Sequence, residues 1–340
     1  MPTHLTRKVA VPLAAVAMAL TLAVGSSSAT TRTSATSNAR PSSIKVLRVA
    51  LVAPSATNDL AFTESMYNAL EALKVSQHLQ ISVSENEFVV ADAANVIRQY
   101  ASEGYNLILA HGSQYGSTVE ALAPQFPKVS FAWGTAASTF GMKNIFAYEA
   151  ASNEGGYVQG YMGAMLSKSH VVGVIGPIAT GDAKLYVDGF VAGAKAEDKK
   201  ITAHQVYTGS FSDDSLMATA AKTFVSDGAD VLTGSSQSVV GAIGVAKADH
   251  LPWFGTQWTQ AVLAPKNVVS SQLYNWKPTL IAMIKDIRAG KRGGATYVLK
   301  LGNGGEKIQF NPGYKLAKSI KAKGLALIKA IEHNKIKVPT

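Results

Sequence analysis

The stretch LRVALVAPSATNDLAFTESMYNALEAL, residues 47–73, sets an apolar strand, a short polar turn and an amphipathic helix in succession. The helix is predicted because apolar residues recur at helical spacing; they are Phe62, Met66, Ala69, Leu70 and Leu73. In an open α/β sheet, such a turn lies at the carboxyl end of a strand, where ligands bind. A phosphate site would place glycines there, whereas this turn contains Asn58 and Asp59 and leads to Phe62. It therefore predicts a ligand site made of an amide, a carboxylate and an aromatic ring.

The same alternation of strand and helix continues to about Gly290, which predicts βαβ units and parallel sheets. The strand candidates are Val46–Ala53, Gln80–Val83, Leu107–Ala110, Lys128–Ala132, Ile145–Tyr148, Val171–Ile175, Thr202–Tyr207, Val231–Thr233, Trp253–Thr256 and Val268–Leu273. They divide into two similar groups near residues 150–155. The chain of 340 residues is long enough for two domains, so we expect an α/β fold of two doubly wound lobes.

The pattern changes after Trp276, where a helix is followed by a predicted hairpin around Asn303-Gly304-Gly305. We expect residues 45–150 with about 258–280 to form the N-terminal lobe. Residues 151–257 with about 281–325 would form the C-terminal lobe, and residues 326–340 the tail of a C-terminal helix.

The amino-terminal residues have the features of an export signal. Residues 1–29 combine a basic start, an apolar run and a small-residue cleavage site ending at Ala29, which predicts a signal peptide. Residues 30–44 are rich in Ser and Thr and are expected to form a disordered leader. The chain contains no cysteine, so we expect an exported, extracytoplasmic protein without lipidation or disulfides. It would be secreted or associated with the cell envelope.

The formal net charge of +10 comes largely from lysines near the carboxyl terminus. These lysines alternate with apolar residues at helical spacing, which is typical of a solvated helix face. No nucleic-acid-binding motif accompanies them. We interpret the charge as an adaptation to a negatively charged envelope and expect no nucleic-acid partner.

The sequence assembles no convincing catalytic set. The histidines are scattered, and neither an HExxH motif nor a GxSxG elbow is present. The glycines of VIGPIATG lack the Lys-Ser/Thr of a phosphate-binding loop. We therefore expect no metal site, no cofactor and no enzymatic activity.

The loops after the predicted strands, by contrast, share one character. They carry small hydroxyl and amide residues with single aromatic rings, which suit a neutral polyhydroxylated or heteroaromatic ligand. Two lobes facing each other across a cleft indicate a hinged clamp. The candidate ligand-binding residues from these loops are Asn58, Asp59, Phe62, His111, Ser113, Gln114, Trp133, Tyr148, Gln237, Gln257 and Trp258.

Several blocks match a known family pattern. They are NDLAF (58–62), VEALAPQFPKVSFAWG (119–134), NEGGYVQGYMGAMLSK (153–168), VDGFVAGAK (187–195) and YTGSFSDDSLMATAAKTFVSDGADVL (207–232). On these blocks the chain resembles, from about Val46 to Phe310, the basic membrane protein (BMP) family of ABC-transporter substrate-binding proteins. That family includes the purine nucleoside receptor lipoproteins of bacterial importers. The resemblance implies a type I periplasmic-binding-protein fold, with two Rossmann-like lobes and three hinge crossings. It also implies that a nucleoside base stacks on Phe62, with Asn58 and Asp59 beside it.

The chain departs from the family at a Gly-Val-Asp-x-Asp-Gln block, which here is GTQWTQ, residues 255–260. Both carboxylates are replaced by neutral groups, and the lysine of the next strand end appears as Tyr274 or Asn275. Loss of a carboxylate together with an amine preserves the charge balance, so a neutral ligand remains compatible. Gln257 and Asn275 are then candidate contacts, and Trp258 offers a second aromatic plane.

Three functions follow from these patterns. The first is a solute-binding protein of an ABC importer that clamps a nucleoside or a similar small ligand, with an ABC permease as partner and the monomer as its state. The second is a ligand-sensing protein that presents the closed clamp to a membrane receptor. A nucleoside-cleaving hydrolase ranks last, because the aspartates do not form the carboxylate cluster that such chemistry requires.

Overall fold

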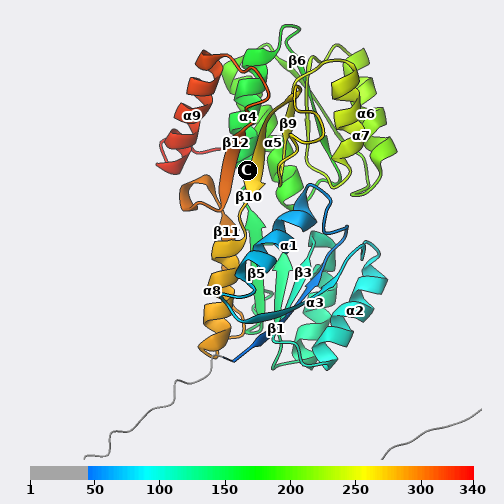
Figure 1. Ribbon diagram of the computed structural model, residues 1–340, viewed down its shortest axis with the longest axis vertical. Helices are drawn as coiled ribbons and strands as arrows, with labels where there is room; N and C mark the ends of the chain where they lie inside the picture. Colours follow the sequence, from blue (N-terminus) through cyan, green and yellow to red (C-terminus); the bar gives the residue numbers. More distant parts are fainter. Residues whose placement is uncertain (1–44) are drawn as a thin grey trace, which may run out of the picture. The chain divides into compact units, whose positions relative to one another are not determined.

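Two six-stranded sheets organise residues 45–340, the part of the chain that the computed structural model describes (Figure 1). The first sheet has the strand order β11-β5-β4-β3-β1-β2, and the second has the order β12-β10-β9-β8-β6-β7. The signal peptide expected at residues 1–29 and the leader expected at residues 30–44 lie outside the described residues.

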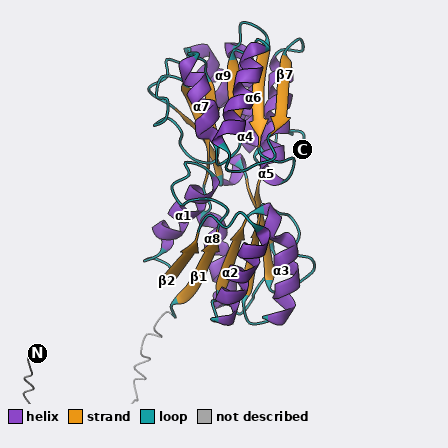
Figure 2. Cartoon of the chain, turned by 90° about the vertical axis from the view of Figure 1, so that its right-hand side faces the viewer, coloured by secondary structure: helices purple, strands orange, loops and turns teal. Residues whose placement is uncertain are grey.

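The first sheet is parallel throughout. Its strands are β1 (Leu47–Val52), β2 (Leu79–Ser84), β3 (Leu107–His111), β4 (Ser130–Gly134), β5 (Ile145–Ala150) and β11 (Thr296–Leu299). Successive side chains of a strand point to opposite faces, so Leu51 packs toward α1 (Phe62–Leu73) and α8 (Lys277–Arg288). Val52 packs toward α2 (Val90–Ser102) and α3 (Gly116–Leu122) on the other face (Figure 2). This sheet and its four helices are called the first lobe below.

The second sheet is built in the same way, except that its edge strand β12 runs antiparallel to β10. Its strands are β6 (Val171–Gly176), β7 (Thr202–Tyr207), β8 (Val231–Gly234), β9 (Trp253–Gly255), β10 (Val268–Tyr274) and β12 (Glu306–Phe310). One face is covered by α4 (Asn153–Leu166), α5 (Gly181–Glu197) and α9 (Lys318–Glu332). The other is covered by α6 (Asp214–Ser226) and α7 (Val239–Ala248). This sheet and these helices are called the second lobe.

The last third of the chain differs from the expected lobe assignment. Residues 258–280 were expected in the N-terminal lobe, but β10 pairs with β9 and β12 in the second sheet. Residues 281–299 instead complete the first lobe, because α8 packs in its core and β11 pairs with β5. The chain thus passes between the sheets three times, at residues 150–153, 274–277 and 299–306.

The predicted hairpin is wrong for the same reason. β11 and β12 flank the turn, but they belong to different sheets. Gly304 does adopt the left-handed conformation that the turn requires, with φ at 70°. The apolar residues decide the outcome, because Leu299 is buried in the first lobe and Ile308 in the second.

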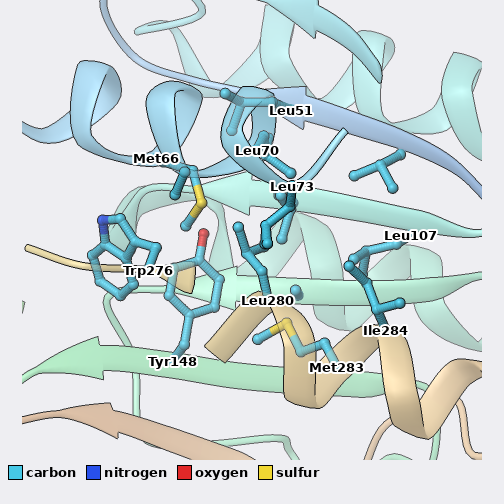
Figure 3. Packing of buried hydrophobic residues seen from close by; sticks show 14 of the residues in the cluster. Leu51, Met66, Leu70, Leu73, Leu107, Tyr148, Trp276, Leu280, Met283 and Ile284 are labelled. Carbon is cyan, nitrogen blue, oxygen red and sulfur yellow. The ribbon is translucent and has the colours of Figure 1, made fainter. Parts of the chain in front are cut away.

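The second crossing is anchored in the core of the first lobe. Figure 3 shows Trp276 beside Tyr148 and Met66, with Leu280 of α8 in the same cluster. The indole Nε1 of Trp276 donates a hydrogen bond to Ser65 Oγ of α1 at 2.9 Å. The crossing therefore begins in the second sheet and is fixed, two residues later, to the helix that follows β1.

Every helix of residues 45–340 is too short or too polar to span a lipid bilayer.

The second lobe depends on close contact between α4 and α5. Gly156 and Gly160 of α4 face Gly189 and Gly193 of α5, and a Cβ atom at any of these positions would overlap backbone atoms of a neighbouring segment. A Cβ atom at Gly160 would meet the carbonyl of Phe190. The glycines thus allow the two helix backbones to touch.

We expect Gly160→Ala to lower the free energy of unfolding by about 1–3 kcal/mol. The added Cβ atom meets backbone atoms, which cannot rotate away as a side chain can. Gly244→Ala in α7 is the matched control, since no atom lies within 4 Å of a Cβ atom there. That change should raise the free energy of unfolding by about 0.5–1 kcal/mol. Urea titration of both variants checks the pair, and equal effects would contradict the packing argument.

Candidate functional site

A small cavity of about 20 Å³ lies where the carboxyl ends of the parallel strands of the two sheets meet. Its walls come from the loops after β1, β3 and β4 in the first lobe and after β6, β7, β8 and β9 in the second. The lining residues are Pro54, Phe62, Gly112, Ser113, Gln114, Thr135, Pro177, Thr180, Asp182, Ala183, Phe211, Ser235, Gln237 and Gln257. This is the position at which open α/β sheets bind ligands.

The aromatic wall of the first lobe is Phe62, supported from behind by a buried histidine. The rings of Phe62 and His111 are parallel, with centroids 3.7 Å apart and planes 3° apart. Burial lowers the pKa of His111 to about 3, so the imidazole is neutral. Its Nε2 lies 3.1 Å from the Phe62 carbonyl, which can only accept, so Nε2 carries the proton. Nδ1 then accepts from the Tyr148 hydroxyl at 2.8 Å.

His111 and Tyr148 were expected to contact the ligand, but neither belongs to the cavity wall. Both are fully buried, and their hydrogen-bonding atoms are engaged with Phe62 and with each other. They fix the position of the Phe62 ring. The alternation of side chains along β3 and β5 does not distinguish a residue that lines the cavity from one that lies in the layer behind the wall.

The polar pair of the first turn forms a helix cap instead of reaching the cavity. Asp59 Oδ1 accepts hydrogen bonds from the amides of Ala61 and Glu64, at 2.8 and 3.0 Å. Its Oδ2 accepts from the Thr63 amide and from Ser55 Oγ, at 3.1 and 2.7 Å. A carboxylate is stabilised by the free N–H groups at the start of α1. Asn58 is exposed on the outside of the same turn.

The carboxylate in the cavity is Asp182, in the first turn of α5. The residue is 5% exposed, and its Oδ2 atom is buried with no hydrogen-bond partner among residues 45–340. Burial raises the pKa of Asp182 to about 6, while the neighbouring Tyr274 and Gln257 side chains partly offset this rise. A buried carboxyl with a free oxygen is poised to accept a hydrogen bond from a ligand.

Neither Asp182 nor Phe211 was among the predicted contacts, although Phe211 lies in one of the blocks that carry the family resemblance, residues 207–232. Phe211 is half-buried and comes from the second lobe. Its ring meets that of Phe88, from the first lobe, edge-on at 5.9 Å. The cavity therefore has one aromatic ring from each lobe in its wall.

Three buried amides add polar groups without partners. Gln114 Nε2, Gln237 Oε1 and Gln257 Oε1 all lack a hydrogen-bond partner in the described residues. Gln257 also adopts a left-handed backbone, with φ at 67°, which is uncommon for a residue with a side chain. Leaving such groups unpaired costs about 1–3 kcal/mol each, and strain of this kind concentrates at functional sites. The cavity is thus arranged to receive polar atoms.

Of the sequence-predicted residues, Phe62, Ser113, Gln114, Gln237 and Gln257 are brought together in the cavity wall. Trp133 lies elsewhere: it stacks on Phe140, with centroids 4.9 Å apart, and covers Gly116 of α3. Trp258 and Asn275 line a different hollow, beside the crossings between the lobes.

A family model and individual related proteins both match this chain. The family model described as ABC transporter substrate-binding protein, PnrA-like, matches residues 46–338. The transcriptional activator protein med of Bacillus subtilis (strain 168) is 25% identical over 261 residues, covering 76% of this chain and 81% of that protein. A purine-binding protein of Brucella abortus (strain 2308) is 29% identical over 206 residues, covering 61% of this chain and 58% of that protein.

A solved structure extends the relationship to the fold. The ABC transporter solute-binding protein from Conexibacter woesei DSM 14684 superposes with a TM-score of 0.70 at 25% sequence identity. The match covers 86% of this chain and 98% of that one. The two lobes and the cavity between them are therefore the arrangement of a type I periplasmic binding protein.

Asp182→Asn should stabilise the protein without ligand at neutral pH. Because the folded pKa of about 6 lies above 3.8, the ordinary pKa of an aspartate, the folded state binds more protons than the unfolded state between these values. The free energy of unfolding therefore falls as pH rises from about 4 to about 6, by about 1–3 kcal/mol. We expect this part of the decline to be absent from the variant.

Urea titration of both proteins at pH 4 and pH 7 measures the difference. Asp227→Asn, which changes an exposed aspartate, should retain the decline of the unaltered protein. A decline of equal size in Asp182→Asn would contradict the assignment.

Proposed function

The chain belongs to the PnrA-like family of ABC transporter substrate-binding proteins, and from this premise we propose that it binds a nucleoside in the cavity between its lobes. The observation that carries the proposal is the composition of the wall: an aromatic ring from each lobe, with unpartnered buried amides and one carboxylate. The cavity of about 20 Å³ is smaller than a nucleoside, so the lobes would have to part to admit one.

The base would stack between Phe62 and Phe211. The face of Phe62 that His111 covers is unavailable, so the opposite face receives the base. Phe211 lines the same cavity from the other lobe and is held by one edge contact with Phe88. A ring on each lobe makes stacking complete only when the lobes are together, which couples binding to closure.

The sugar would be held by Asp182. The family's carboxylate after β9 is replaced here by Gln257, but Asp182 approaches Gln257 from the first turn of α5. Its free Oδ2 would accept hydrogen bonds from sugar hydroxyls. Gln114 and Gln237 offer the amide groups that read the edge of a base. The cavity thus supplies a carboxylate from a different element of the fold.

The protein would deliver its ligand, unaltered, to an ABC permease. Solute-binding proteins of ABC importers work outside the cytoplasm, and we propose export through the signal peptide expected at residues 1–29. Without a cysteine for lipidation, retention at the envelope would depend on charge. We propose that it acts as a monomer. Sensing for a membrane receptor is the second candidate, favoured by the likeness to a protein named as a transcriptional activator.

A thermal-shift screen against nucleosides, free bases, pentoses and hexoses tests the ligand class. A nucleoside present at a hundred times its dissociation constant should add about 2.7 kcal/mol to the free energy of unfolding. A rise in melting temperature with sugars alone would overturn the nucleoside proposal.

Phe211→Ala should weaken nucleoside binding by about 1–3 kcal/mol, the contribution of one base–aromatic stack. Phe211 is preferable to Phe62 for this test, because Phe62 is 3% exposed and belongs to the core. Phe140→Ala is the matched control, since Phe140 is also half-buried but stacks on Trp133 away from the cavity. Calorimetric titration compares the two. Unaltered affinity in Phe211→Ala would refute the stacking role.

Nucleoside affinity should fall as pH drops below about 6. Sugar hydroxyls donate to the ionised Asp182, so the bound state favours ionisation and holds the pKa of this carboxyl below its value of about 6 in the free protein. Binding is then strongest above this pH. Calorimetric titration from pH 4.5 to pH 8 should show the decline, and Asp182→Asn should bind more weakly with a flat profile. A parallel decline in that variant would assign the pH dependence to another group.

A further inference from the structure

A second hollow of about 370 Å³, open to solvent, lies beside the crossings between the lobes and shares no lining residue with the cavity. One wall is α1 of the first lobe, and another is formed by the second and third crossings. The lining residues are Ser65, Asn68, Ala69, Ala72, Trp258, Leu273, Tyr274, Asn275, Lys277, Gly304 and Lys307. We call it the hinge hollow. Any molecule that fills it touches both lobes and two of the three crossings.

The hinge hollow combines a flat apolar surface with positive charge. Trp258 is half-buried, and Ala69 and Leu273 contribute further apolar area. Lys277 and Lys307 are exposed, and within residues 45–340 neither ammonium lies within 4 Å of a carboxylate. The carboxylate next to Lys307, that of Glu306, faces the interior and accepts from Gln272 Nε2 at 2.8 Å.

We propose that the hinge hollow is a second binding site, for a small anion that carries a flat ring, such as an aromatic carboxylate, sulfonate or phosphate. The indole of Trp258 receives the ring, since aromatic rings pack favourably on one another. Lys277 and Lys307 attract the anionic group from opposite lobes. The charge complementarity decides the class of ligand, because a neutral ring would leave both ammonium groups without a partner.

The hinge hollow is connected to the ligand cavity by two short paths. Gln257 lines the cavity and its neighbour Trp258 lines the hollow, and the Tyr274 amide donates to the Gln257 carbonyl at 3.1 Å. On the other side, Ser65 lines the hollow and accepts from Trp276, whose ring meets Phe62 edge-on at 6.1 Å. An anion in the hollow thus contacts groups that are one residue, or one side chain, from the cavity wall.

This placement gives the sign of the coupling. A molecule bound to α1 and to both crossings favours the arrangement of the lobes that encloses the cavity. It therefore raises the affinity of the cavity for its own ligand, and the cavity ligand raises its affinity by the same factor. The coupling rests on the proposed function, whereas binding in the hollow does not.

The binding test uses naphthalene-1-sulfonate and the indole N–H signals of ¹⁵N-labelled protein. The chain has four tryptophans, and Trp258→Phe identifies the signal of Trp258. Titration should shift that signal saturably, and naphthalene-1-sulfonamide, which is neutral, should bind at least tenfold more weakly. An unmoved Trp258 signal, or equal affinity for the two compounds, would overturn the site.

Paired lysine variants make the test specific. Lys277→Gln with Lys307→Gln should raise the dissociation constant of the sulfonate at least fivefold. Lys266→Gln with Lys285→Gln is the control, because these lysines are also exposed, one in each lobe, and line neither hollow nor cavity. Equal losses of sulfonate affinity in the two pairs would show that only the net charge of the protein matters, and would refute the site.

The coupling test measures nucleoside affinity by calorimetry with and without saturating sulfonate. We expect an increase of at least threefold, which the Lys277→Gln and Lys307→Gln pair abolishes. If sulfonate shifts the Trp258 signal but nucleoside affinity is unaltered, the coupling is refuted and the site stands. If no nucleoside binds at all, the proposed function fails, while the titration of Trp258 still decides the hinge hollow.

Discussion

The stack of Phe62 on a neutral, buried His111 is the contact on which the first lobe and its cavity wall depend. The imidazole donates to the Phe62 carbonyl and accepts from Tyr148, so it holds both the backbone and the ring of the residue that begins α1. Trp276 closes the same cluster edge-on to all three rings. Because Trp276 directly precedes α8, the cluster joins the ligand wall, the core and a crossing into one packed unit. A protonated imidazole would place a charge in this apolar setting, and the low pKa of His111 follows from that cost.

The second lobe differs in this respect, because some of its buried polar side chains lack hydrogen-bond partners among residues 45–340. In the described part of the chain, Asp182 and Gln257 each have one oxygen at the cavity without a hydrogen-bond partner, and Gln257 also has a left-handed backbone conformation. Ser152, at the first crossing, donates to the carbonyl of Asp182, so the carboxylate's backbone is tied to the hinge. These groups lower the stability of the empty protein. A site that binds by completing hydrogen bonds gains its affinity from the same groups.

Much of the fold was predictable from the sequence, because apolar runs of strand length and helical periodicity depend on local order. The first five strands begin and end within two residues of their predicted positions. The position of the cavity followed from the rule for parallel sheets. What failed depended on partners distant in sequence: β10 and β11 read equally well as members of either sheet, and only the cores that bury Val269 and Leu299 assign them. Similarly, the carboxylate of Asp59 serves a helix terminus, while that of Asp182 remains free, and spacing alone does not distinguish these two environments.

The edge strands have a consequence for the order in which the chain acquires its structure. β5 pairs with β11 and β10 pairs with β12, so each sheet is completed by a strand from residues 296–310. Neither sheet is complete until residues 296–310 have left the ribosome, and the contact between β5 and β11 spans a long loop that closes slowly. Both sheets therefore keep an open edge until synthesis has passed these residues.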